Sequence, residues 1–331
     1  MADHPFDSRM NEEVVQFSFM ESTMILGIKP TVDFAFKKIF GSPQNVAALI
    51  GLLNAILDLK KPIVSVEILN PFSYQEFADS KLIVLDVRCR DSAGRYMNVE
   101  MQVSVYAGLI QRLTYYACSM HVDQLSKGGS YASLAPSISI CLLSHALFTG
   151  SDQSHHCFEM RDQRSGRKLD NAIEVHTVEL TKYNLLEETI SQATKLDQWA
   201  FLLLRAQDYD AATLRRLLPG IEFEAAIETI KTISEKTEDK QMYDQREKAQ
   251  RDYEWALSGA REEGREEGRE EGREEGERLG VEKGKLAGKV QLLQELLGDT
   301  PSSDAELQEF ATETLAEQLT VLQQRIRERE V

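Results

Sequence analysis

Two consecutive predicted β-strands, each with a carboxylate near its centre, constrain the fold of this chain more than any other feature. They occupy residues 82–103, LIVLDVRCRDSAGRYMNVEMQV, and a short turn with a glycine joins them. Asp86 and Glu100 stand where apolar or neutral residues are expected. A carboxylate in a buried strand is costly unless it is paired, hydrogen-bonded or bound to a cation. The segment therefore predicts either a hard-cation site or a hairpin whose carboxylates face solvent.

The period of a β-strand indicates which of these side chains share a face. Residues two apart in a strand point to the same side, so Glu100 and Gln102 are expected to point together. Pairing about a turn centred on Ser92 and Ala93 places Asp86 roughly across from Glu100. Two carboxylates and a strand carbonyl are enough to hold Mg²⁺, which keeps several of its waters. Such an ion activates a water and neutralises charge on a phosphate oxygen. The third acidic residue of the hairpin, Asp91, is interpreted as a turn residue.

The distribution of charge leaves a nucleic-acid partner open. The chain of 331 residues has a formal charge of −16, which by its sum argues against such a partner. Residues 22–130, however, contain 11 basic and 9 acidic residues, so the acidity lies mostly outside the segment with the two carboxylates. Charge therefore neither excludes DNA nor supports it.

Cysteine usage and hydropathy predict a cytoplasmic protein. The four cysteines are scattered, without a C-x-x-C pair, which is typical of reduced thiols. No apolar run approaches the roughly 18 to 20 residues that span a bilayer, and no secretory signal is visible. His155, His156 and Cys157 stand together, but no fourth metal ligand is evident, so a polar loop is the favoured interpretation.

The order of predicted elements indicates an α/β fold. Helices are expected in DFAFKKIF (33–40), NVAALIGLLNAILDL (45–59) and 106–125, and strands at 63–69, in the hairpin, at 137–143 and at 173–180. Residues after 184 are expected to be helical. The pattern predicts a mixed β-sheet core flanked by helices, with a helical C-terminal extension.

The C-terminal part contains a plain repeat. Residues 261–276 are REEG four times, which as a helix gives stripes of glycine, arginine and glutamate. The repeat is interpreted either as a solvated charged linker or as a surface for self-association. The expected division of the chain is a poorly ordered leader (1–23), a domain that holds the α/β core with the two carboxylates (24–205), a helical region (206–260) and a charged repeat with amphipathic helices, a candidate region for oligomerisation (261–331).

Several segments in order resemble one family. The spacing D-x13-E-x-Q from Asp86 to Gln102 lies between DFAFKKIFG and LLNAIL on one side and R-x-x-YY on the other. QLSKGGSY, SISICLL, VHTVELTKY, LDQWAFLLL and EEGREEGR follow. From about Lys29 to Ala287 the chain resembles the PD-(D/E)xK nuclease family transposases, which are grouped with the recombination-promoting nucleases (Rpn family) of bacteria.

The resemblance implies a restriction-endonuclease-like core and metal-dependent cleavage of DNA. Asp86, Glu100 and Gln102 would be the catalytic residues, with Gln102 in the slot of the superfamily's lysine. The metal, Mg²⁺ or alternatively Mn²⁺, would be held by Asp86, Glu100 and the Met101 backbone carbonyl. A glutamine there can only hydrogen-bond, so the metal must stabilise more of the transition-state charge.

Five further residues are expected to take part. Asp33 matches the family's first-helix acid and is a candidate metal ligand, or else an N-terminal helix acid. Arg112 and Tyr116 share a helix face, which suggests contact with DNA, or else a core helix with an extended arginine. Lys37 and Lys38 could contact the DNA backbone or form a solvated face.

Two functions from different classes follow. The first is a Mg²⁺-dependent DNA endonuclease of transposase-like or recombination-promoting type. The alternative is a catalytically weak or inactive family member that acts as an oligomeric DNA- or protein-binding module through its C-terminal helices. A phosphodiesterase acting on RNA or nucleotides is a third possibility. No membrane partner is expected.

Overall fold

The protein divides into two compact units. The computed structural model describes residues 24–73, 86–104, 108–169 and 172–329. One unit comprises Met1–Glu254 and the other Trp255–Val331, and the boundary falls within a single long helix.

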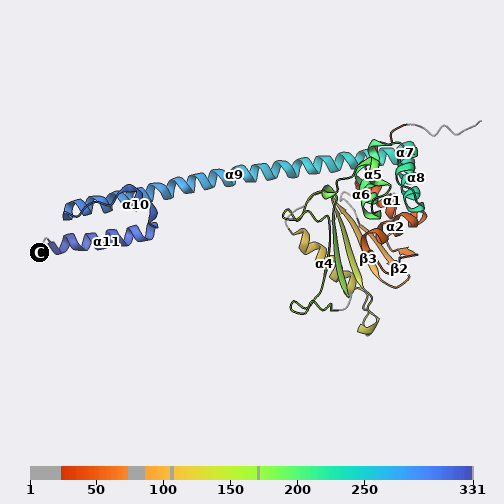
Figure 1. Ribbon diagram of the computed structural model, residues 1–331, viewed down its shortest axis with the longest axis horizontal. Coiled ribbons are helices and arrows are strands. Elements are labelled where there is room, and N and C mark those ends of the chain that lie inside the picture. Colours follow the sequence, from red (N-terminus) through yellow and green to blue (C-terminus); the bar gives the residue numbers. More distant parts are fainter. Residues whose placement is uncertain (1–23, 74–85, 105–107, 170–171, 330–331) are drawn as a thin grey trace, which may run out of the picture. The chain divides into compact units, whose positions relative to one another are not determined.

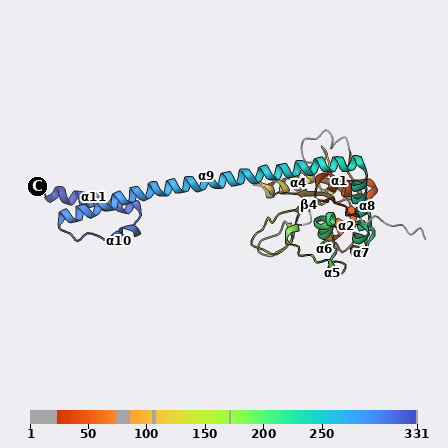
Figure 2. The same ribbon diagram turned by 90° about the horizontal axis from the view of Figure 1, so that it is seen from above.

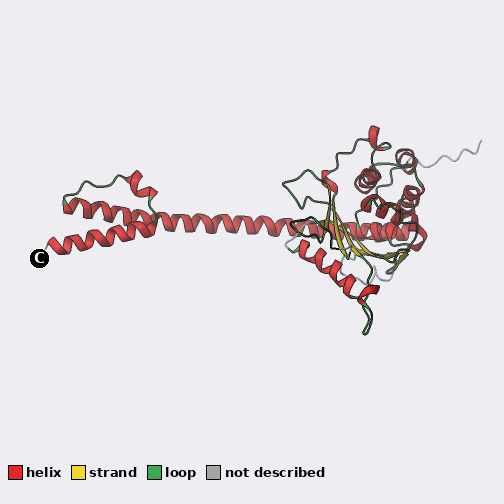
Figure 3. Cartoon of the chain, turned by 60° about the horizontal axis from the view of Figure 1, so that its bottom comes forward, coloured by secondary structure: helices red, strands yellow, loops and turns green. Residues whose placement is uncertain are grey.

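The first unit contains a mixed β-sheet whose strands lie in the order β1-β2-β3-β4-β6-β5. The strands are β1 (Val66–Ile68), β2 (Asp86–Asp91), β3 (Tyr96–Gln102), β4 (Ser137–Leu143), β5 (His155–Glu159) and β6 (Ile173–Glu179). The pairs β1/β2, β2/β3 and β5/β6 are antiparallel, whereas β3/β4 and β4/β6 are parallel. The sheet is drawn in yellow in Figure 3, with helices beside it.

One face of this sheet carries the main hydrophobic core. Met97, Val99 and Met101 of β3 point to it, as do Ile138, Ile140 and Leu142 of β4. Apolar residues of six helices pack there: α1 (Asp33–Phe40), α2 (Val46–Leu57), α6 (Lys195–Arg205), α7 (Ala211–Leu217), α8 (Ile221–Glu235) and the start of α9 (Thr237–Leu297). The short helix α5 (Glu187–Ile190) adds Ile190 to the same cluster. Figure 1 shows α1, α2, α6 and α8 grouped on one side of the strands.

Among the described residues, the helix that covers the opposite face is α4 (Leu109–Val122). Leu109 and Leu113 of α4 form a smaller core cluster with Cys141 and Leu143 of β4. On β3 this face is polar and still buried, because Asn98, Glu100 and Gln102 are at most 8% exposed. We call this side of the sheet the α4 face.

The second unit is helical. It contains the C-terminal part of α9, α10 (Asp304–Glu309) and α11 (Thr312–Arg329), which folds back along the last turns of α9 (Figure 2). Val290 and Leu297 of α9 pack there with Leu307, Leu315 and Leu322. The REEG repeat belongs to α9 and is exposed throughout. The repeat is thus helical along its whole length.

The expected fold class is confirmed, with local corrections. The strand predicted at 63–69 is shorter, Val66–Ile68, and residues 82–85 of the hairpin lie outside the described part of the chain. The interpretation of His155–Cys157 as a polar loop was wrong, because these residues form β5 and pair with β6. Alternation of apolar and polar residues is weak at that sheet edge, so periodicity did not reveal the strand.

Among the described residues, no single helix has the length and hydropathy needed to cross a bilayer. The bent pair made of Asp33–Phe40 and Pro43–Leu57 meets that test only when the two are taken together.

Candidate active site

The register of β2 and β3 places the two conspicuous carboxylate positions opposite each other. Asp86 pairs with Glu100 in the antiparallel ladder, and Arg88 pairs with Asn98 two residues further along. The turn that sets this register contains Gly94 at φ 85°, a conformation that favours glycine. The side chain of Asp91 accepts hydrogen bonds from the Arg95 backbone N–H at 2.9 Å and from Arg95 Nε at 2.7 Å. Asp91 is thus a turn residue, as its position in the sequence indicated.

Glu100 is a buried carboxylate that two side chains hold on the α4 face. It is 3% exposed. Gln102 Nε2 donates a hydrogen bond to Glu100 Oε2 at 3.0 Å, as expected for side chains two apart in a strand. Arg112 Nη2 donates to the same oxygen at 3.1 Å and forms an ion pair with it. An ionised carboxylate at this depth needs such a partner, so the pair stabilises the charged form of Glu100.

Arg112 therefore has a different environment from the one expected. It reaches from α4 towards the sheet, and its guanidinium lies 5.5 Å from the centre of the Tyr116 ring. The shared helix face of these two residues is thus confirmed, and the arginine side chain remains one-third exposed. Tyr115, at 66% exposure, points away from the core. Arg112 can touch both the buried carboxylate and any group that approaches from solvent.

The residues of α1 do not join this cluster. Asp33 is buried, and Arg246 of α9 holds its Oδ2 through Nη2 and through Nε at 2.8 Å. Its Oδ1 accepts the Phe34 backbone N–H at 2.7 Å. α1 packs in the main core, on the face of the sheet opposite to α4. Asp33 is thus committed to an ion pair that joins α1 to α9.

The two lysines of α1 are also engaged inside the protein. Lys37 is fully buried, so its ammonium does not lie on a surface that DNA could reach. Lys38 pairs with the buried Asp239 of α9 at 2.5 Å and lies against the ring of Phe34. Burial lowers the pKa of Lys38 against the opposing effect of Asp239. The expected contact of these lysines with a DNA backbone is not what the structure supports.

The donor set at the hairpin suits a hard cation. Glu100, the Asp86 position opposite it and the backbone of Met101 supply oxygen donors of the kind that Mg²⁺ and Mn²⁺ prefer. Only the backbone of Asp86 is described. Within the described residues, no three histidine, cysteine, aspartate or glutamate side chains converge on a metal position. A metal ion at the hairpin would therefore be held by two carboxylates and a backbone carbonyl. Asp33 would not take part, because it is paired with Arg246.

Sequence analysis missed two basic residues beside this site. Arg88 and Arg90 follow Asp86 at every second position of β2 and are exposed. They pair in register with Asn98 and Tyr96, and the guanidinium of Arg90 lies 5.3 Å from the centre of the Tyr96 ring. The alternation R-C-R, with the buried Cys89 between them, was the signal that could have identified them.

Comparison with known proteins identifies the family. A family model for PD-(D/E)XK nuclease family transposases matches residues 30–260. The chain belongs to this family. No curated protein and no solved structure was found to match it. Membership confirms the resemblance carried by the sequence motifs and agrees with the mixed sheet and flanking helices.

Family membership supports a nuclease-like function, with DNA as the implied substrate. Nucleases of this family typically use divalent metal ions. The matched region includes every strand of the sheet, α4 and the start of α9. It therefore covers both the hairpin with Glu100 and the helix that carries Arg112.

Proposed function

We propose that this protein is a metal-dependent DNA endonuclease of transposase-like, recombination-promoting type. The observation that supports this most directly is the position of Glu100, a buried carboxylate opposite Asp86 in register and contacted by both Gln102 and Arg112. In a chain that belongs to a nuclease family, two facing carboxylates on adjacent strands support a metal site at this hairpin. Asp86, Glu100 and the Met101 carbonyl would hold Mg²⁺ or Mn²⁺, which supplies an activated water and neutralises phosphate charge when bound.

The roles of the protein's own residues follow from their contacts. Arg112 pairs with Glu100, so its positive charge compensates the buried carboxylate that would bind the metal. Gln102 holds the orientation of that carboxylate by a hydrogen bond between side chains. Because Gln102 is uncharged, the nearby guanidinium of Arg112 supplies the positive charge that a lysine in its place would provide. The exposed Arg88 and Arg90 would contact the DNA backbone.

The first test is a nicking assay with pure full-length protein. Supercoiled plasmid should be converted to nicked circles in Mg²⁺ or Mn²⁺, and a chelator should stop the reaction. Single-stranded DNA and RNA of the same sequence are assayed in parallel. No cleavage of any DNA in either metal would contradict the proposal, and DNA binding without cleavage would favour the non-catalytic alternative. Cleavage of RNA at the same rate would favour a general phosphodiesterase.

Arg112 offers a sharper test of how the site works. Arg112→Ala is expected to lower the initial nicking rate by roughly 10²-fold, the usual cost of removing one charged donor from a reaction site. Arg112→Lys should retain more activity because it keeps the charge, although it cannot reproduce the guanidinium's contact with both Glu100 and Tyr116. Thr114→Ala, at an exposed position of the same helix, is the matched control. Equal rates for the alanine and lysine variants would exclude a role for the charge.

We further propose that the C-terminal unit mediates self-association. Apart from its internal core, this unit has exposed apolar residues on α9, namely Leu279, Val281, Leu292 and Leu296. The glycines of the repeat have no atom within 4 Å of the position a Cβ would take. A helix with such a surface is suited to contact another copy.

Removal of residues 260–331 is therefore expected to lower the number of subunits per particle measured by light scattering. The nuclease unit keeps its own core in this variant, because that core ends before Trp255. A full-length protein that is already monomeric would contradict self-association.

A further inference from the structure

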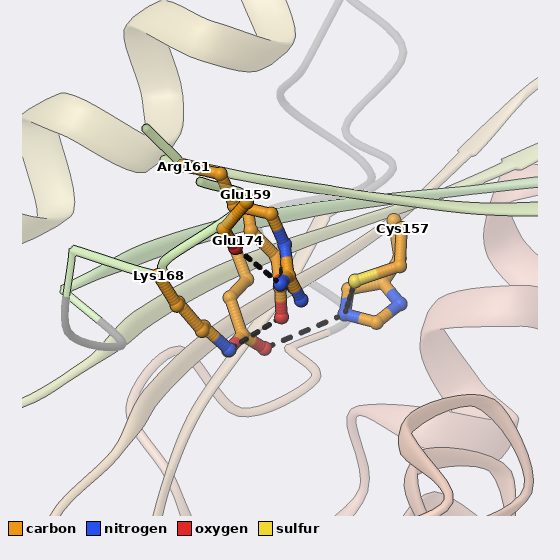
Figure 4. A network of polar contacts seen from close by, with 7 residues as sticks. Cys157, Glu159, Arg161, Lys168 and Glu174 are labelled. Atoms are coloured by element: carbon orange, nitrogen blue, oxygen red, sulfur yellow. Dashed lines mark hydrogen bonds and ion pairs between the residues drawn. The ribbon is translucent and has the colours of Figure 1, made fainter. Parts of the chain in front are cut away.

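A second cluster of chemically active side chains lies on the other face of the sheet from Glu100. His155 and Cys157 of β5 both contact His176 of β6, and Cys157 pairs directly with His176 in the antiparallel register. His176 in turn pairs with Ile140 of β4, whose side chain is in the main core. Figure 4 shows Cys157 beside the network of Glu159, Arg161, Lys168 and Glu174. The cluster is thus separate from the proposed nuclease site.

The contacts of the His176 ring use both of its nitrogens. Nδ1 lies 3.0 Å from Nε2 of His155, whereas Nε2 lies 3.6 Å from Sγ of Cys157 and 3.7 Å from Oε2 of Glu174. Since His155 and Cys157 meet opposite edges of the ring, the three residues do not converge on one metal position, in agreement with the lack of any such group among the described residues. The arrangement instead resembles a thiol paired with an imidazole.

The electrostatics of the cluster favour a charged His176. Burial lowers the pKa of His176, but the hydrogen bonds with Cys157 and Glu174 outweigh it and raise the pKa to about 9. Burial, followed by the charge of His176, lowers the pKa of His155 to about 4. At neutral pH, His155 is therefore neutral and accepts the proton on Nδ1 of His176. The Nε2 proton then faces the sulfur and the carboxylate.

A neighbouring salt-bridge network limits competition for that proton. Glu174 also pairs with Lys168 at 2.9 Å, and Lys168 pairs with Glu159. Arg161 pairs with Glu159 as well. The charge of Glu174 is thus shared between Lys168 and His176.

Cys157 faces a cleft large enough for a small molecule. The cleft has a volume of about 970 Å³, and its walls include His155, Cys157 and His176 on the sheet and Asn54 of α2 on the other side. Lys195 at the start of α6 and Glu222 at the start of α8 also line it, paired with each other at 2.9 Å. The volume lies in the upper part of the range for small-molecule sites. Cys157 is exposed and can be reached from this space.

The other cysteines lack this environment. Cys89 and Cys141 are buried, and burial raises the pKa of Cys89 to about 12 and that of Cys141 well above its usual value. Cys118 on α4 is partly exposed and, within the described part of the chain, has no hydrogen bond to an imidazole of the kind that joins Cys157 to His176. Cys118 can therefore serve as the reference with which the reactivity of Cys157 is compared in the same protein.

We propose that Cys157, held against His176 at the wall of this cleft, is a nucleophilic thiol that forms mixed disulfides with low-molecular-weight disulfides. The Cys157 sulfur attacks one sulfur of the disulfide, a new S–S bond forms, and the S–S bond of the reagent breaks. The released thiolate takes up one proton, so that overall the proton of the Cys157 thiol moves to the departing thiol. His176 is a positioning residue that stabilises the attacking thiolate.

The test uses full-length protein and bis(2-hydroxyethyl) disulfide, a small neutral probe. Mass spectrometry of tryptic peptides follows the adduct at each cysteine with time at pH 7. Cys157 is expected to react about tenfold faster than Cys118, because it is exposed at the cleft and its sulfur lies 3.6 Å from Nε2 of His176, which can stabilise the attacking sulfur, whereas Cys118 is only partly exposed. Cys157→Ser should lose the fast adduct, and His176→Asn should slow Cys157 to about the rate of Cys118. Equal rates for the two cysteines in the wild type would overturn the proposal, as would an unchanged rate in a folded His176→Asn protein.

A pH profile of the wild type keeps the test independent of any variant. The ratio of the two rates should fall from about ten at pH 7 towards one as the pH rises past 9, because His176, whose pKa is about 9, loses its positive charge there and no longer favours attack by the sulfur beside it. The charged and titratable groups around the thiol are His155, Glu174 and His176 on the strands, Lys168 beside them, Asp58 of α2, Lys195 of α6 and Glu222 of α8. A ratio that is constant from pH 7 to pH 10 would show that His176 does not act on Cys157.

Discussion

Glu100→Ala is expected to reduce plasmid nicking in Mg²⁺ by about 10³-fold or more, because loss of one metal carboxylate removes several kcal/mol of transition-state stabilisation. Asp86→Ala should have an effect of the same order, since Asp86 lies opposite Glu100 in the ladder and the two are proposed to hold the same ion. The effects should not add in the double variant, because each substitution alone disables the same unit. The comparison uses the initial nicking rates of the wild type, the two single variants and the double variant at saturating metal.

The control separates catalysis from folding. Glu67→Gln changes an exposed carboxylate on β1 of the same sheet and should leave the nicking rate unchanged. Glu100→Gln keeps the volume of the side chain while removing its charge, so the thermal unfolding midpoint should change less than it does in the alanine variant. If Glu100→Gln nicked DNA at the wild-type rate, the assignment of Glu100 as a metal ligand would be wrong.

Arg246→Met is expected to lower the free energy of unfolding of the first unit by about 3 to 5 kcal/mol. Arg246 and Asp33 form an ion pair whose side chains are 11% and 4% exposed, and the substitution leaves the Asp33 carboxylate buried without its cation. Adding Asp33→Asn to Arg246→Met should recover a large part of the loss, because no buried charge then remains. Arg251→Met, at an exposed position of the same helix, should change stability by no more than about 0.5 kcal/mol.

The change in the free energy of unfolding can be measured by urea titration with tryptophan fluorescence, in a protein whose only tryptophan is buried in this core. Trp199 is fully buried, whereas Trp255 is 82% exposed. In a Trp255→Phe protein, the emission therefore reports the core that contains α1, α6 and α8. Identical unfolding curves for Arg246→Met and Arg251→Met would mean that the ion pair does not stabilise the packing of α9 against α1.

The sequence predicted the elements that local pattern controls. Alternation and turn chemistry located the hairpin and placed Asp86 roughly across from Glu100, and the observed ladder pairs the two directly. The run SISICLL, 137–143, corresponds residue for residue to β4. The i, i+4 spacing of Arg112 and Tyr116 correctly placed both on one face of α4. In each case the information lies within a few residues along the chain.

The sequence did not predict which charged side chains pair with one another. Lys38 and Asp33 are separated from Asp239 and Arg246 by about two hundred positions or more in the chain, so nothing local indicated that α9 would bind them. Their charges suggested contact with DNA and metal, whereas the structure pairs them inside the protein. His176 and Cys157 likewise meet only because β5 and β6 are neighbours at the edge of the sheet.

By itself, then, the sequence determined the fold class, the family and the two carboxylate positions, because strand period, turn residues and motif order are local properties of a chain. Only the tertiary structure decided which cation each buried carboxylate keeps: Arg112 for Glu100 and Arg246 for Asp33. The physical reason is that burial penalises every unpaired charge, so the partner is chosen by which helix packs over the carboxylate.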